Sequence, residues 1–186
     1  MQETLKGTFS VSMLLPALKP GGDFFDIKRQ NNFIAGLSMG GFGALKAALR
    51  NPGQYAAAAS LSGGVQIRRP GPSQEAVPGA PSSVPTAKYL FGAYGSDYQY
   101  YNSEHEDLRV ILKNAVDAGE PLPKLYLCCG TEDFLYQSNL EYRDYALSLG
   151  VDLTYAEGPG VHDWDFWDPY IRRILDWLPL KCGFVD

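Results

Sequence analysis

The segment 33–45, FIAGLSMGGFGAL, constrains the fold more than any other part of the chain. Its first half is apolar and has the length of a buried strand, and helical composition follows over 39–50. Ser38 lies between the two halves, in the frame GLSMG (36–40), which matches G-x-S-x-G. A strand that turns at once into a helix, with a hydroxyl at the turn, predicts an α/β fold with chemistry at the end of the strand.

Strand-like and helix-like segments alternate along most of the remaining chain. Residues 1–31 are predicted to be helical or irregular, and an S-x-x-E capping box at Ser103 and Glu106 predicts the start of a helix. The predicted strands are 32–38, 55–64, 124–130 and 151–158, and further helices are predicted at 139–149 and 167–178. This alternation predicts a parallel sheet of about four strands with helices on both faces, in a single domain over 1–186.

The segment 63–101 interrupts this alternation. It is rich in proline, glycine and tyrosine and shows no clear pattern of strand or helix. Connections of this length are usually functional, so we expect a lid-like insertion here.

Composition and charge exclude several functions. The net charge of −5 and the pI near 5.0 argue against nucleic-acid binding, because no Lys/Arg cluster is present to neutralise phosphates. The apolar runs are too short to span a membrane. Cys128 and Cys129 are adjacent in an apolar run, which indicates buried thiols rather than a disulfide framework and favours a cytoplasmic location.

The glycine frame around Ser38 has a chemical purpose. A serine hydroxyl becomes a useful nucleophile when it projects from a sharp turn towards a base, and the flanking glycines leave room for that turn. The helix that follows directs its first N–H groups at the site, so Met39 and Gly40 are the predicted oxyanion and substrate-binding residues. Ser60 and Ser62 lack the full glycine frame and are better interpreted as loop serines.

The chain has two histidines that could serve as the base. His162 lies in a loop after the last predicted strand, where α/β proteins gather their chemistry, whereas His105 is predicted on an exposed helical turn. An acid is needed to orient the histidine, and Asp133 directly follows the strand 124–130. The adjacent Glu132 is the alternative, while the aspartates after His162 are too near it in sequence. The resulting order Ser38, Asp133, His162 is that of α/β-hydrolases.

Four segments together resemble a known family. FIAGLSMGGFGALKAAL, LSGG, CCGTEDFLY and GVHDWDFWD are similar to the esterase D and tributyrin esterase group of α/β-hydrolases. That group is related to feruloyl and acetyl-xylan esterases and to S-formylglutathione hydrolase. The resemblance covers about residues 31–178. It implies Ser38 as nucleophile, Asp133 as acid and His162 as base. Separately from the resemblance, we expect Trp164, Phe166 and Trp167 to anchor the last helix and to line the pocket.

The activity implied by the resemblance is hydrolysis of small-molecule short-chain, aryl or carbohydrate acyl esters through an acyl-enzyme. No metal or organic cofactor is implied. The alternatives are a thioesterase of the S-formylglutathione type and a catalytically weak remnant that acts only as a binding or structural module.

The chain departs from the pattern of this family in one respect. Only 37 residues precede Ser38, and they contain no H-G-G stretch, so the chain is predicted to lack the N-terminal strands of the family. The strand 32–38 would then have an uncovered edge, and the second oxyanion donor would be missing. Because an uncovered apolar edge invites pairing, we expect a homo-oligomer or association with a missing N-terminal half.

Overall fold

The computed structural model describes residues 12–14, 28–65 and 102–179. These residues form one five-stranded sheet with the order β1-β2-β3-β4-β5. The strands are β1 (Ser12–Leu14), β2 (Phe33–Leu37), β3 (Ala57–Leu61), β4 (Lys124–Gly130) and β5 (Leu153–Gly158). Strands β2 to β5 are parallel, as predicted, and β1 is antiparallel to β2.

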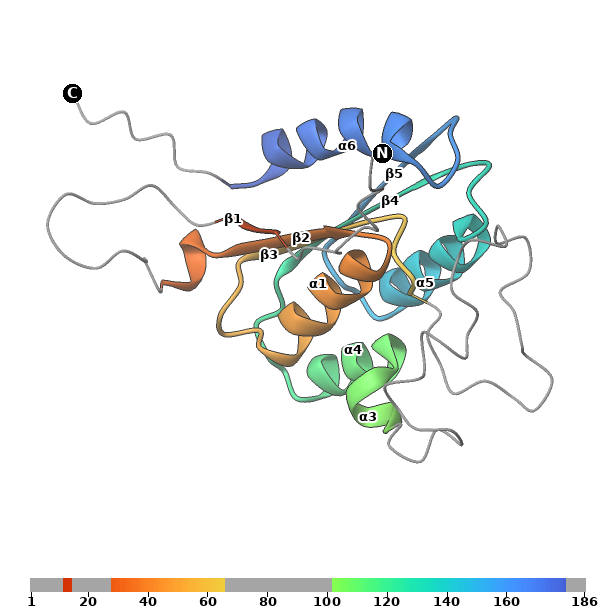
Figure 1. Cartoon of the computed structure of the whole chain (residues 1–186). Coiled ribbons are helices and arrows are strands. Elements are labelled where there is room, and N and C mark those ends of the chain that lie inside the picture. Colours follow the sequence, from red (N-terminus) through yellow and green to blue (C-terminus); the bar gives the residue numbers. More distant parts are fainter. Residues whose placement is uncertain (1–11, 15–27, 66–101, 180–186) are drawn as a thin grey trace, which may run out of the picture.

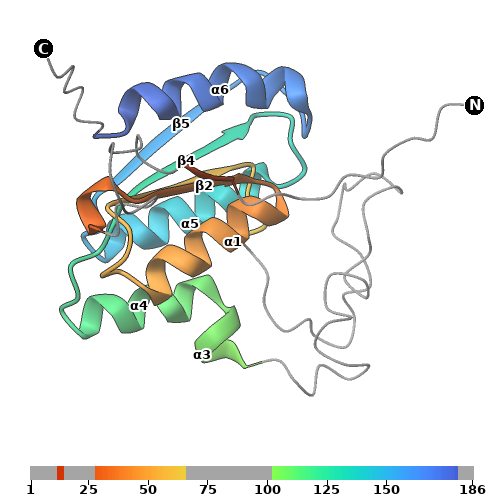
Figure 2. The ribbon, with the colours of Figure 1, turned by 60° about the vertical axis from the view of Figure 1, so that its left-hand side comes forward.

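Helices cover both faces of this sheet. Helix α6 lies along one face, and α1, α4 and α5 lie on the other, with the short α3 beside α4 (Figures 1 and 2). The helices are α1 (Met39–Arg50), α3 (Ser103–Glu106), α4 (Leu108–Asp117), α5 (Tyr136–Ser148) and α6 (Trp164–Trp177), with a short 3-10 turn, η1 (Arg29–Asn31). The predicted α/β architecture with a parallel sheet is therefore confirmed.

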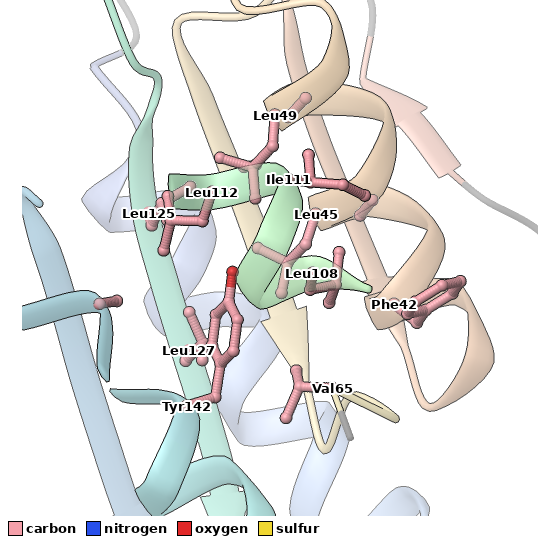
Figure 3. Packing of buried hydrophobic residues seen from close by; sticks show 14 of the residues in the cluster. Phe42, Leu45, Leu49, Val65, Leu108, Ile111, Leu112, Leu125, Leu127 and Tyr142 are labelled. Atoms are coloured by element: carbon pink, nitrogen blue, oxygen red, sulfur yellow. The ribbon is translucent and has the colours of Figure 1, made fainter. Parts of the chain in front are cut away.

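The two faces of β4 show why a parallel strand reads as a continuous apolar run. Leu125 and Leu127 point into the cluster beneath α1, α4 and α5, shown in Figure 3. Tyr126 and Cys128 point into a second cluster beneath α6. Both faces of the strand are buried, so hydrophobic residues are needed at every position.

Two predictions about the N-terminal half of the chain were wrong. β1 lies in the part predicted to be helical or irregular, and it pairs with Phe33–Ala35 of β2. The predicted uncovered edge of the serine strand is therefore covered over these residues. A strand of three residues owes its existence to the neighbouring edge with which it pairs, so its own sequence pattern is weak.

The predicted capping box was also wrong. Ser103 does not cap its helix: the side chain of Asn102 caps α3, accepting from the Glu104 N–H at 2.9 Å. The amphipathic helix α4 begins after Asp107, whose carboxylate accepts from the Arg109 N–H at 2.9 Å. Asn102 and Asp107 are of the short polar types that are preferred at helix N-caps. The sequence therefore contained capping residues, but they lie at positions 102 and 107 rather than at Ser103.

The predicted lid-like insertion at 63–101 lies outside the described residues from position 66 onward. Within the residues that are described, no helix has both the length and the apolar character needed to cross a membrane.

Candidate active site

Ser38 lies at the turn between β2 and α1 in a strained conformation. Its φ is 53° and its ψ is −120°, a combination that serine rarely adopts. Its N–H donates to the Leu61 carbonyl at 2.9 Å, which ties the turn to the end of β3. A Cβ added to Gly36 would lie 2.2 Å from the Gly40 carbonyl oxygen. The first and last glycines of the GLSMG frame therefore approach too closely for a side chain at position 36.

The structure brings together three side chains that are far apart in the sequence. His162 Nε2 lies 2.9 Å from the Ser38 Oγ, and His162 Nδ1 lies 2.8 Å from Oδ2 of Asp133. An ionised carboxylate only accepts hydrogen bonds, so the proton between Asp133 and His162 belongs to Nδ1. Nε2 is then free to accept the proton of the Ser38 hydroxyl. This is the geometry of a serine held against a general base.

The Asp133 side chain is completely buried, which is costly for a charged group unless it is well hydrogen-bonded. Besides His162, the Leu135 N–H donates to its Oδ1 at 2.8 Å. Burial raises the pKa of the Asp133 carboxyl, but hydrogen bonds from His162, from the Leu135 N–H and from Ser62 outweigh it and leave the pKa lowered. Asp133 is therefore ionised at neutral pH and able to orient His162.

Aromatic rings enclose the imidazole of His162. The ring of Phe134 lies 4.7 Å from it between centroids, and the ring of Trp167 meets it edge-on at 4.9 Å and 86°. These contacts limit the orientations open to the imidazole. Trp167 was predicted to anchor the last helix and to line the pocket, but its direct contact with the His162 ring was not predicted.

Glu132, the alternative acid, has a different role. Its carboxylate accepts from the Gly160 N–H at 2.6 Å and from the Thr131 hydroxyl at 2.9 Å, and its own N–H donates to the Gly160 carbonyl at 3.1 Å. The hydrogen bond from Gly160 is the main cause that lowers the pKa of Glu132. Glu132 thus clamps the loop that carries His162 to the end of β4, and it does not bind the imidazole.

The first turn of α1 presents its N–H groups beside Ser38. The earliest intrahelical hydrogen bond runs from the Phe42 N–H to the Ser38 carbonyl at 3.2 Å. The N–H groups of Met39 and Gly40 come before it in the helix and have no intrahelical acceptor. Both are thus placed where the helix dipole favours negative charge.

One of two serines near the site was misjudged from the sequence. Both were predicted to be loop serines: Ser62 does follow the end of β3, but Ser60 lies within β3, and both are fully buried. Ser62 has a φ of 46° and accepts a hydrogen bond from the Trp167 indole N–H at 3.1 Å. The predicted strand 55–64 includes Ser60, so its place within β3 agrees with that prediction rather than with a loop.

The remaining candidates lie in different surroundings. His105 is exposed on α3, as predicted. Trp164 is 68% exposed at the first position of α6, and its ring meets that of Trp167 edge-on at 5.5 Å. Over the described parts of the chain, no group of three or more His, Cys, Asp or Glu residues is placed to hold a metal ion.

Residues 8–178 match the model of the Esterase family, described as "Putative esterase". The chain therefore belongs to the Esterase family, and its fold is that of an α/β-hydrolase, as the resemblance implied. Three individual proteins are similar to the chain over most of its length.

An acetyl esterase from Caldicellulosiruptor saccharolyticus is 31% identical over 154 residues, which are 81% of this chain and 55% of that protein. The S-formylglutathione hydrolase FrmB of Staphylococcus aureus is 30% identical with a TM-score of 0.65, and the match covers 84% of this chain and 57% of that one. The fluorophosphonate-binding serine hydrolase FphF of Staphylococcus aureus is 34% identical with a TM-score of 0.59, with the same coverage of 84% and 57%. The chain thus spans little more than half the length of these relatives.

Proposed function

We propose that the chain is a serine carboxylesterase that hydrolyses short-chain or aryl and carbohydrate acyl esters through an acyl-enzyme. The Ser38 Oγ attacks the ester carbonyl carbon while His162 Nε2 takes its proton. The carbonyl oxygen becomes an oxyanion beside the Met39 N–H, which is one donor, with Gly40 next to it in the first turn of α1. His162 then gives the proton to the leaving alcohol, and water releases the acyl group by the same steps in reverse.

One observation carries this proposal: the continuous hydrogen-bonded chain from Asp133 through His162 to Ser38, with distances of 2.8 and 2.9 Å. Membership of the Esterase family supports it independently of the geometry. The strained φ of Ser38 is a third support, because strain of this kind persists where the surrounding structure needs the conformation.

Trp164 is our candidate for recognition of the substrate. It is a large exposed aromatic ring, and it contacts Trp167, which itself contacts His162. A flat apolar surface at this place suits an aryl or sugar ring in the substrate. The alternative substrate class is a thioester of the S-formylglutathione type, favoured by the 30% identity to FrmB over 84% of the chain.

Turnover of three substrates tests the proposal and separates its branches. p-Nitrophenyl acetate, methyl ferulate and S-formylglutathione are given to the wild type, to Ser38→Ala and to the control Ser60→Ala. We expect hydrolysis by the wild type and by Ser60→Ala, and a loss of about 10⁶-fold in kcat in Ser38→Ala. A folded wild type that hydrolyses none of them contradicts the proposal and favours a binding or structural role.

We also propose that the active form contains further polypeptide, either a second copy or a segment equivalent to the rest of the longer relatives. The support is the span of 55–57% of those relatives. The family resemblance also implies a second oxyanion donor from an early loop of the longer fold, and a missing donor costs about 2.7–4 kcal/mol of transition-state stabilisation. Light scattering on a chromatography column measures the assembly, and a fully active monomer contradicts this part of the proposal.

The buried free thiols of Cys128 and Cys129 support a cytoplasmic location.

A further inference from the structure

We propose that Ser62 is a positioning residue for the Asp133–His162 pair. Its hydroxyl accepts from the Trp167 indole N–H at 3.1 Å, and we infer that its own hydrogen is directed at the neighbouring Asp133 carboxylate. The catalytic consequence rests on the proposed function, whereas the positioning itself can be measured without turnover.

The hydrogen bond between Trp167 and Ser62 has a defined direction. The two atoms lie 3.1 Å apart in a buried place, and an indole nitrogen only donates. The Ser62 oxygen is therefore the acceptor, and its single hydroxyl hydrogen remains available for another partner.

Asp133 is the best acceptor for that hydrogen. Ser62 is among the groups that stabilise the ionised form of Asp133 by a side-chain hydrogen bond. The thiol of Cys129 lies against the same two side chains and is the competing acceptor. An ionised carboxylate accepts much more strongly than sulfur, so the hydroxyl hydrogen goes to Asp133.

Ser62 joins three separate parts of the chain. Its own N–H donates to the Cys128 carbonyl at 2.7 Å, which holds the end of β3 against β4. Its side chain then connects Asp133, after β4, with Trp167, on α6 after the histidine loop. Because the Trp167 ring also packs edge-on against His162, one hydroxyl helps to hold both members of the pair.

The backbone of Ser62 offers independent support. Its φ of 46° is in the left-handed region, where glycine is the usual residue. The loop contains glycines at the next two positions, 63 and 64, yet the residue in the left-handed conformation at position 62 is a serine. A strained residue of this kind next to a proposed site is a reason to look for a role of its side chain.

The experiment compares Ser62→Gly and Trp167→Phe with the control Ser60→Ala. Glycine suits the backbone at 62, so that variant removes the hydroxyl without adding strain. Phenylalanine keeps a ring beside His162 and removes only the donor. Ser60→Ala deletes a hydroxyl that is equally buried, in the adjacent strand, and that has no hydrogen-bond partner in the described structure.

Two readouts are needed. The first is the far-downfield proton resonance of His162 Nδ1–H, which reports its hydrogen bond to Asp133 and is assigned by its loss in Asp133→Asn. The second is kcat and KM for p-nitrophenyl acetate. We expect the resonance to shift or broaden in Ser62→Gly and in Trp167→Phe, and kcat to fall about 10- to 100-fold with little change in KM. The double variant should lose no more than the worse single variant, because both act through the same hydrogen bond.

The possible outcomes separate this inference from the proposed function. An unchanged resonance in Ser62→Gly, or an unchanged kcat in an active protein, overturns the positioning role of Ser62. If the wild type hydrolyses nothing but the resonance responds as expected, the positioning stands and the proposed function fails. An equal response in Ser60→Ala also overturns the inference, since any buried serine would then have the same effect.

Discussion

The carboxyl ends of the strands and the apolar cluster beneath α1, α4 and α5 are built on opposite principles. At the strand ends, Ser38 and Ser62 adopt φ values of 53° and 46°, and the charged Asp133 is buried. In the cluster, Leu125 and Leu127 are fully buried among other apolar side chains, as Figure 3 shows. One region holds strain and buried charge, and the other holds only packing.

The two regions have opposite effects on stability. Strained backbone and buried carboxylates lower the free energy of unfolding, so the packing of the core must raise it by more than this amount for the domain to stay folded. β4 links the two regions within a few residues, because Leu127 packs into the core and Asp133 follows the end of the same strand. Changes at these two positions should therefore have opposite consequences for activity and stability.

The largest effect is expected from Asp133→Asn. The amide keeps the shape of the side chain, but it no longer favours the His162 tautomer that the proposed mechanism needs. We expect kcat for p-nitrophenyl acetate to fall about 10⁴-fold while the circular dichroism spectrum stays unchanged. The matched control is Asp152→Asn, at an exposed aspartate, and an equal loss there would remove the distinction between the two regions.

The reverse pattern is expected from Leu127→Ala. It leaves a cavity in the centre of the core, and the free energy of unfolding should fall by about 2–5 kcal/mol in a urea titration. Below the unfolding transition, kcat should stay within about two-fold of the wild type, since no group of the proposed site moves. A large loss of kcat in a variant that is still folded would show that core and site are coupled.

Acid should affect the strand ends before it affects the core. The pKa of Asp133 is lowered in the folded state, so its contribution to stability is present above the unfolded value of 3.8 and is lost as the pH falls through the folded value. The stability of the wild type minus that of Asp133→Asn should therefore decrease as the pH is lowered from about 5 to 2. Melting temperatures across this range measure the difference, and a constant difference contradicts the assignment.

The smallest effect is expected at the edge of the apolar cluster, at the ion pair between Lys46 of α1 and Glu106 of α3, where Lys46 also lies over the Phe42 ring. Its atoms lie 2.5 Å apart, and the side chains are 24% and 14% exposed. Lys46→Met should cost about 0.2–1 kcal/mol in the free energy of unfolding, with no change in kcat. A cost as large as that of Leu127→Ala would mean that this contact belongs with the core.

Sequence reasoning found the elements that depend on local pattern. The bounds of α1, Met39–Arg50, agree with the prediction, because the turn at Ser38 and Pro52, which disfavours a helical residue before it, are both local signals. The order of Ser38, Asp133 and His162 followed from the rule that parallel strands end at the same edge. β1 was missed because a strand of three residues depends on the edge of β2.

The parts of the site that could not be predicted from the sequence are contacts between distant segments. Glu132 and Asp133 are adjacent carboxylates, and only the folded loop shows that one binds the Gly160 backbone while the other binds His162. Ser62 carries a weak signal, in that a serine is followed directly by two glycines. Its partner Trp167 lies 105 residues away, so pattern alone could not connect them.

The central claim is that His162 activates Ser38, and a fluorophosphonate reaction tests it most directly. The protein is treated with the reagent, digested, and analysed by mass spectrometry for the site and rate of modification. The account predicts a single adduct on the Ser38 oxygen, with a rate that falls by several orders of magnitude in His162→Ala but not in His105→Ala. Modification at another serine, or an unchanged rate in His162→Ala, would contradict it.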